Sequence, residues 1–131
     1  MSTELYRDEF GTITHDREGS LLELVWFEKT ASMTDDDFKE WLERYTAFGE
    51  VHRPALMLID GRRFRHRFGA ELASWREEHI IPRYNAAGLR KLAFLLPKQF
   101  LPGTQPAPEA GAAFPTGYFD TREQVNEWFG A

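Results

Sequence analysis

The chain has 131 residues, a length typical of one domain, and its formal net charge of −5 argues against general binding to nucleic acids, which favours a basic surface. It contains no cysteine, which excludes disulfides, thiolate metal sites and a cysteine nucleophile. No apolar run approaches the roughly 20 residues of a transmembrane segment, and residues 1–9 lack the basic start and apolar stretch of a signal peptide. We therefore expect a single cytoplasmic domain over residues 1–131.

The first half of the chain predicts a β-hairpin followed by a helix. Residues 12–15 and 21–28 are β-rich and flank a polar turn, and the second segment has apolar side chains on both faces, which favours a strand inside a sheet. Thr34 and Asp37 have the spacing of a capping box. Apolar residues follow at helical spacing, which predicts a helix that ends at Gly49.

The next segments continue the alternation of strands and helices. The apolar run 54–60 predicts a buried strand that ends at Asp60. Residues 69–79 predict a second helix, which Pro82 should end or kink because proline lacks an N–H group. Residues 91–96 predict another strand.

The C-terminal part begins with a segment rich in Pro, Gly and Ala. Residues 97–117 predict a long loop without regular structure. A short strand at 118–119 and a helix capped by Asp120 follow. This order of elements predicts an α/β fold with a single-layer mixed, mainly parallel sheet of four or five strands covered by helices.

Three features give the chain a resemblance to a known family. Strand 21–28 leads into a helix opening Met33–Phe38, strand 55–60 ends in Asp, and residues 118–129 have an aromatic-Asp-x-x-Glu-x-x-x-x-Trp pattern. In order and spacing these features resemble the STAS fold of anti-sigma-factor antagonists, especially its SpoIIAA-like branch. The resemblance implies a small, non-enzymatic regulatory module that binds a protein or a small ligand. It also implies peripheral contact with lipids or membranes for some members.

The chain departs from this family at one position. Antagonists with a phosphorylation switch carry a serine directly after the strand that corresponds to 55–60. Residues 61–69 here contain no Ser or Thr, and the nearest, Ser74, lies a full turn into the second predicted helix. The resemblance therefore does not supply a residue for the kinase-driven switch.

The segment after the buried strand carries most of the functional signal. It is strongly basic in an acidic chain, and its candidate binding residues are Asp60, Arg62, Arg63, Arg65, His66 and Arg67. Arginine binds phosphate and carboxylate groups through paired hydrogen bonds. Three interpretations stay open: a solvated surface paired with the chain's own acidic residues, a contact with a protein partner or anionic surface, and a site for a small anionic ligand.

Individual residues of this segment also have two interpretations each. Asp60 either caps the turn after its strand or orients one of the arginines. His66 is either a surface histidine or a neutral hydrogen-bond donor in a site. Phe64 and Phe68 either anchor the loop in the core or stack on nucleic acid bases, and we favour anchoring.

The first function that we expect is a non-catalytic binding module that contacts a protein partner or an anionic group through the 60–69 edge. The alternative is a pocket for an apolar or lipid-like ligand between the sheet and the second helix, roofed by the 97–117 loop. Its candidate residues are Phe64, Phe68, Trp75, Phe100, Leu101 and Phe114. The many aromatic residues also make a homodimer plausible, since such residues are frequent at interfaces.

No motif of an enzyme or a metal site is present. The chain lacks HExxH, GxSxG, Walker A and GxGxxG patterns. We therefore expect no catalytic residues, no metal and no cofactor.

Overall fold

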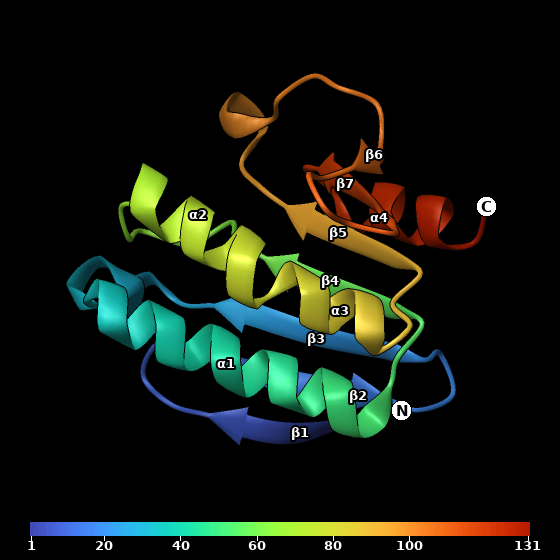
Figure 1. Ribbon diagram of the computed structural model, residues 1–131, viewed down its shortest axis with the longest axis horizontal. Coiled ribbons are helices and arrows are strands. Elements are labelled where there is room, and N and C mark those ends of the chain that lie inside the picture. The colour runs from blue at the N-terminus through green and yellow to red at the C-terminus, as the bar shows by residue number, and fades with distance from the viewer.

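One mixed β-sheet organises the computed structural model, which describes residues 1–131 (Figure 1). Its seven strands lie in the order β1-β2-β3-β4-β5-β7-β6. The strands are β1 (Ser2–Arg7), β2 (Gly11–Asp16), β3 (Leu21–Trp26), β4 (Leu56–Asp60), β5 (Lys91–Leu95), β6 (Ala107–Pro108) and β7 (Pro115–Phe119). Strands β3, β4, β5 and β7 are parallel to one another, whereas β1, β2 and β3 form an antiparallel meander.

The expectation of a mainly parallel sheet of four or five strands is wrong. The sheet has seven strands, and three of its six pairings are antiparallel, namely β1 with β2, β2 with β3, and β6 with β7. Both unexpected strands lie at the edges. β1 is largely exposed and so lacks a run of apolar residues, and β6 is a two-residue strand inside the predicted loop.

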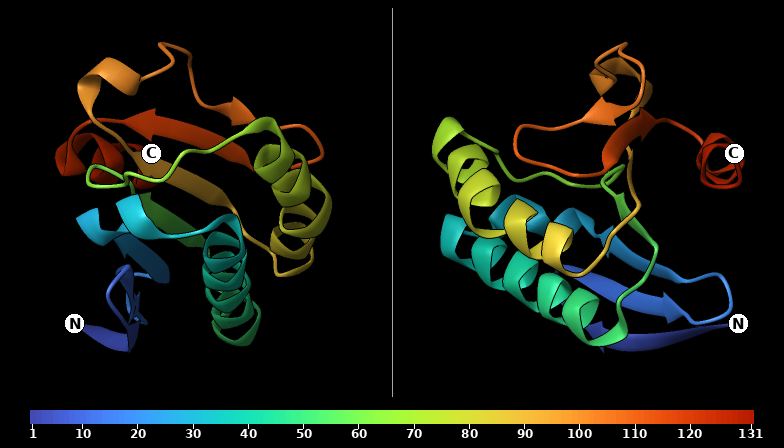
Figure 2. Two further views of the ribbon diagram at one scale, coloured as in Figure 1. Left: turned by 90° about the vertical axis from the view of Figure 1, so that its left-hand side faces the viewer. Right: turned by 45° about the vertical axis from the view of Figure 1, so that its right-hand side comes forward.

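Helices lie on both faces of the sheet. They are α1 (Asp35–His52), α2 (Ala70–His79), α3 (Ile81–Ala86) and α4 (Arg122–Phe129), with short 3₁₀ helices at Glu28–Ser32 and Lys98–Phe100. Helices α1, α2 and α3 cover one face, and α4 packs on the opposite face near β5 and β7 (Figure 2). None of these helices has the length and apolar character needed to cross a membrane.

The ends of the helices follow local hydrogen bonding. The predicted capping box is confirmed: the Asp37 backbone N–H donates to Thr34 Oγ1 at 3.1 Å, and the Thr34 N–H donates to the Asp37 carboxylate at 2.9 Å. Helix α1 continues past Gly49 to His52 and is capped by Arg53, which has the left-handed φ of 47°. Gly49 instead lies inside the helix, where an added Cβ would contact Met57. Helix α4 is capped by Thr121 rather than by Asp120.

Alternation along the strands divides the core into two parts. In β3, Leu22, Leu24 and Trp26 point toward α1 and the main hydrophobic core, whereas the alternate side chains are half-buried on the other face. The predicted interior position of this strand is confirmed, because it pairs with β2 on one side and β4 on the other. A smaller cluster under α4 includes Leu58 and Val125.

The parallel arrangement brings four strand ends to one edge of the sheet. The chain leaves β3, β4 and β5 at this edge through residues 27–34, 61–69 and 96–106. In open α/β sheets, ligands usually bind beside the carboxyl ends of parallel strands. This edge is therefore the first place to look for a site.

Candidate functional site

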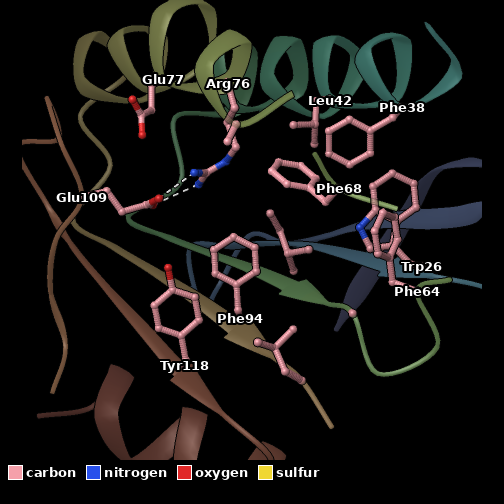
Figure 3. A pocket seen from close by; sticks show the side chains of 14 residues that line it. Trp26, Phe38, Leu42, Phe64, Phe68, Arg76, Glu77, Phe94, Glu109 and Tyr118 are labelled. Carbon is pink, nitrogen blue, oxygen red and sulfur yellow. Dashed lines mark hydrogen bonds and ion pairs between the residues drawn. The ribbon is translucent and has the colours of Figure 1, made fainter. Parts of the chain in front are cut away.

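A cavity of about 420 Å³ lies between this edge of the sheet and helix α2 (Figure 3). Each of the four parallel strands contributes a side chain from its last two residues: Trp26, Ile59, Phe94 and Tyr118. Helix α2 lies opposite and contributes Ala73, Arg76 and Glu77. The remaining lining residues are Phe38, Leu42, Gly61, Phe64, Phe68, Leu96 and Glu109.

Aromatic rings form most of the wall. Trp26 and Phe64 have ring centroids 5.2 Å apart, and Phe38 contacts Phe68 edge to face, also at 5.2 Å. Phe94 and Tyr118 are direct neighbours on β5 and β7 and stack at 5.4 Å. Aromatic pairs in these geometries are stabilising, so the rings hold one another in place around the cavity.

The other end of the cavity carries a buried ion pair. Arg76 on α2 donates from Nη1 to Glu109 Oε1 at 2.6 Å and from Nη2 to Oε2 at 3.0 Å. Thr116 on β7 donates its hydroxyl to the same Oε2 at 2.9 Å. The guanidinium also lies 5.5 Å from the centroid of the Phe94 ring. These contacts connect α2 to the 96–114 segment beside the cavity.

Both members of this pair are charged at neutral pH. Burial disfavours the charge of Arg76, but its hydrogen bonds to Glu109 and the negative charge of Glu109 together outweigh this effect, so the pKa of Arg76 is raised. Burial likewise raises the pKa of Glu109, but the hydrogen bonds from Arg76, the positive charge of Arg76 and the hydrogen bond from Thr116 together lower it by more, so that the net shift is downward. Burial and the nearby Glu109 raise the pKa of Tyr118, which therefore keeps its proton.

The Arg-rich segment is held by the protein's own groups. Asp60 accepts two side-chain hydrogen bonds from Arg62, at 3.0 and 2.7 Å, and a third from the Arg62 backbone N–H. His66 Nε2 lies 2.7 Å from Asp35 Oδ1. Asp60 thus has both predicted roles, as a cap of the turn and as a partner of an arginine.

The other arginines of the segment point in different directions. Arg63 lies 3.6 Å from the Glu28 carboxylate and near the Phe27 ring. The Arg65 backbone N–H donates to Thr30 Oγ1 at 2.8 Å, and its guanidinium contacts the backbone carbonyls of Arg62 and Phe64. Arg67 has no partner within the protein. The candidate binding residues are therefore neighbours in sequence but do not converge on one point.

The residues predicted for an apolar pocket separate into two groups. Phe64 and Phe68 line the cavity. Phe114 is buried instead in the main core against Tyr84, and Trp75 lies beside His79 on α2. Phe100 is 67% exposed, and Leu101 next to it also lies outside the cavity.

Sequence reasoning missed the residues at the polar end. Arg76 belongs to a helix with many charged residues, which is typical of a solvated surface, and Glu109 lies in the segment predicted to be an irregular loop. Their partnership spans 33 positions of sequence. Of the other lining residues, Phe94 could have been predicted from the sequence, because it lies two residues after Leu92 on the same face of an apolar strand.

The structure contains no group of three or more His, Asp or Glu side chains arranged to hold a metal ion. Comparison with protein-family models, with curated proteins and with solved structures gives no match to this chain. The likeness to STAS domains therefore stays a prediction from the sequence.

Proposed function

We propose that this protein is a non-catalytic binding module that holds an apolar small molecule in the cavity between the sheet and α2. The observation that supports this most strongly is the aromatic wall, formed by the rings of Trp26, Phe38, Phe64, Phe68, Phe94 and Tyr118. A volume of about 420 Å³ lies within the range of small-molecule sites, which are mostly apolar with a few polar groups. Binding removes apolar surface of the ligand and of these rings from water, which is favourable by roughly 25 cal/mol per Å².

The contacts of the Arg-rich segment favour this proposal over a docking edge for an anion or a protein. Asp60 and Asp35 already bind Arg62 and His66. An anion at Arg62 or His66 would have to replace these internal partners, and Arg63, Arg65 and Arg67 do not converge on one point with them. The same contacts hold in place the segment that carries Phe64 and Phe68, so the basic residues support the wall of the cavity.

A module of this kind agrees with what the STAS resemblance implies, namely a small domain that binds without catalysis. A ligand enclosed by α2, the 61–69 segment and the 96–114 segment would touch three separate parts of the chain. Binding would therefore stabilise their arrangement at the edge of the sheet. A partner protein that recognises this arrangement would then bind the ligand-bound form more tightly than the free form.

Titration with the uncharged fluorescent probe N-phenyl-1-naphthylamine tests the proposal. Ala73 lies on the wall of the cavity and Ser74 is exposed next to it on the same helix. We expect saturable binding to the wild-type chain, loss of binding in Ala73→Phe, and unchanged binding in the matched control Ser74→Phe. Ala73→Leu provides a smaller obstruction if the phenylalanine variant does not fold. Absence of saturable binding, or equal binding by the two variants, would contradict the proposal.

A further inference from the structure

The charges that line the polar end of the cavity bear on which ligand it takes. The positive charge of Arg76 is already balanced by Glu109 through two short hydrogen bonds. Glu77 also lines the cavity and has no ion-pair partner. One positive and two negative side chains therefore face this end of the cavity.

An anionic ligand is disfavoured by this arrangement. A carboxylate or phosphate near Arg76 would meet the carboxylate of Glu109 in the same place. To take the two hydrogen bonds that Arg76 donates to Glu109, it would have to displace Glu109, which also accepts a hydrogen bond from the Thr116 hydroxyl. At the remaining N–H groups of Arg76 it would lie beside the Glu109 carboxylate, which repels it. Displacement would leave a largely buried carboxylate without its cation, which is costly.

A cationic ligand is disfavoured for a different reason. The guanidinium of Arg76 already lies over the Phe94 ring at 5.5 Å, where it takes the cation–π position. An ammonium group at this end of the cavity would be repelled by that guanidinium. The free acid nearby, Glu77, is exposed to water, so its attraction is weakened by solvent.

An uncharged head group can form hydrogen bonds at this end of the cavity without the electrostatic repulsion that an anion or a cation would meet. Arg76 uses two of its N–H groups for Glu109, and its others have no protein partner. The hydroxyl of Tyr118 also lines the cavity and has no hydrogen-bond partner in the protein. A hydroxyl can accept a hydrogen bond from either group and donate one to Glu109.

We infer that the ligand is an uncharged amphiphile, with an apolar body against the aromatic rings and a hydroxyl-type head group at the Arg76–Glu109–Tyr118 end. This inference rests on the proposed function and adds the chemical class of the ligand. It requires the ion pair to stay intact when the ligand is bound.

Three matched probes test this inference: 2-naphthalenemethanol, 2-naphthoate and 2-naphthylmethylammonium, each used at neutral pH to displace N-phenyl-1-naphthylamine. We expect the alcohol to bind at least about tenfold more tightly than either ion, since a buried charge without a partner is costly. Equal or tighter binding of the naphthoate or the ammonium would overturn the inference, and so would failure of all three to displace the probe. Failure of N-phenyl-1-naphthylamine itself to bind is a different result, because it removes the proposed function.

The variant Glu109→Gln makes the test specific to the ion pair. It leaves the charge of Arg76 without a counter-ion, so we expect the ratio of naphthoate to alcohol affinity to rise by about tenfold or more. The control Glu78→Gln removes a negative charge from α2, the helix that carries Arg76, but outside this cavity, and it should leave the ratio unchanged. Should Glu109→Gln fail to fold, the double variant Arg76→Gln/Glu109→Gln keeps neutral partners, and it should retain the preference for the alcohol. An unchanged ratio in Glu109→Gln, or a preference for naphthoate in the double variant, would overturn the inference.

Discussion

Asp60 binds the guanidinium of Arg62 through both of its carboxylate oxygens, at 3.0 and 2.7 Å, although the two residues are only two positions apart. Asp60 is buried at the end of β4, whereas Arg62 is about half exposed. The pair therefore closes the turn that leads into the Arg-rich segment. It also neutralises the first arginine of the edge that the sequence predicted to bind a partner.

Removal of Arg62 should destabilise the fold, and removal of Arg67 should not. Arg62→Ala leaves the buried Asp60 carboxylate with only the backbone N–H, so we expect a loss of about 1–2 kcal/mol in the free energy of unfolding. Arg67 has no partner, and Arg67→Ala should change stability by less than about 0.5 kcal/mol. Urea denaturation of the two variants measures the difference. Equal stability of both variants would show that the Asp60–Arg62 contact has no structural role.

The Arg76–Glu109 pair should be strongly coupled. Arg76→Met leaves the carboxylate of Glu109 largely buried without a cation, which we expect to cost about 3 kcal/mol. The double variant Arg76→Met/Glu109→Met replaces both charges with apolar side chains and should recover most of this loss. Urea denaturation of the single and double variants gives the coupling energy. A double variant less stable than Arg76→Met would contradict this account of the pair.

His15 should make stability depend on pH. Its ring lies 4.3 Å from that of His52, and burial together with the charge of His52 lowers the pKa of His15 below its ordinary value of 6.5. The unfolded chain therefore binds a proton more readily, so the free energy of unfolding should fall as the pH falls from 6.5 toward the lower pKa of the folded state. Above the ordinary value this contribution is constant.

Denaturation series between about pH 7 and pH 5 check this dependence. His15→Gln should reduce the slope of stability against pH. His52→Gln should reduce it less, because burial of His15, the larger cause, remains. A slope that is the same in the wild-type chain and in His15→Gln would rule out this role of His15.

The sequence predicted those parts of the fold that depend on local chemistry. Thr34 and Asp37 form the capping box because three residues of a helical turn bring their groups together. The interior position of β3 followed from its apolar residues on both faces. Strands β1 and β6 were missed because edge strands bury little side-chain surface. The end of α1 was misplaced because the helix continues past Gly49 and is closed by Arg53 in the left-handed conformation.

The site was less predictable, because its geometry depends on contacts that are distant in sequence. Phe64 and Phe68 could be nominated since they interleave with a conspicuous basic run. Phe94 and Tyr118 become neighbours only through the pairing of β5 with β7. The partner of Arg76 lies 33 residues away, in a segment with no periodic pattern, so no local rule connects them.

Nuclear magnetic resonance of the tryptophan indole N–H groups tests most directly whether the cavity is the binding site. Trp26 lines the cavity, whereas Trp128 packs with Phe119 on the opposite face of the sheet. During titration with N-phenyl-1-naphthylamine we expect the Trp26 signal to shift in a saturable manner while the Trp128 signal stays in place. A Trp26 signal that does not move at saturation, or a shift confined to Trp128, would contradict a ligand site between the sheet and α2.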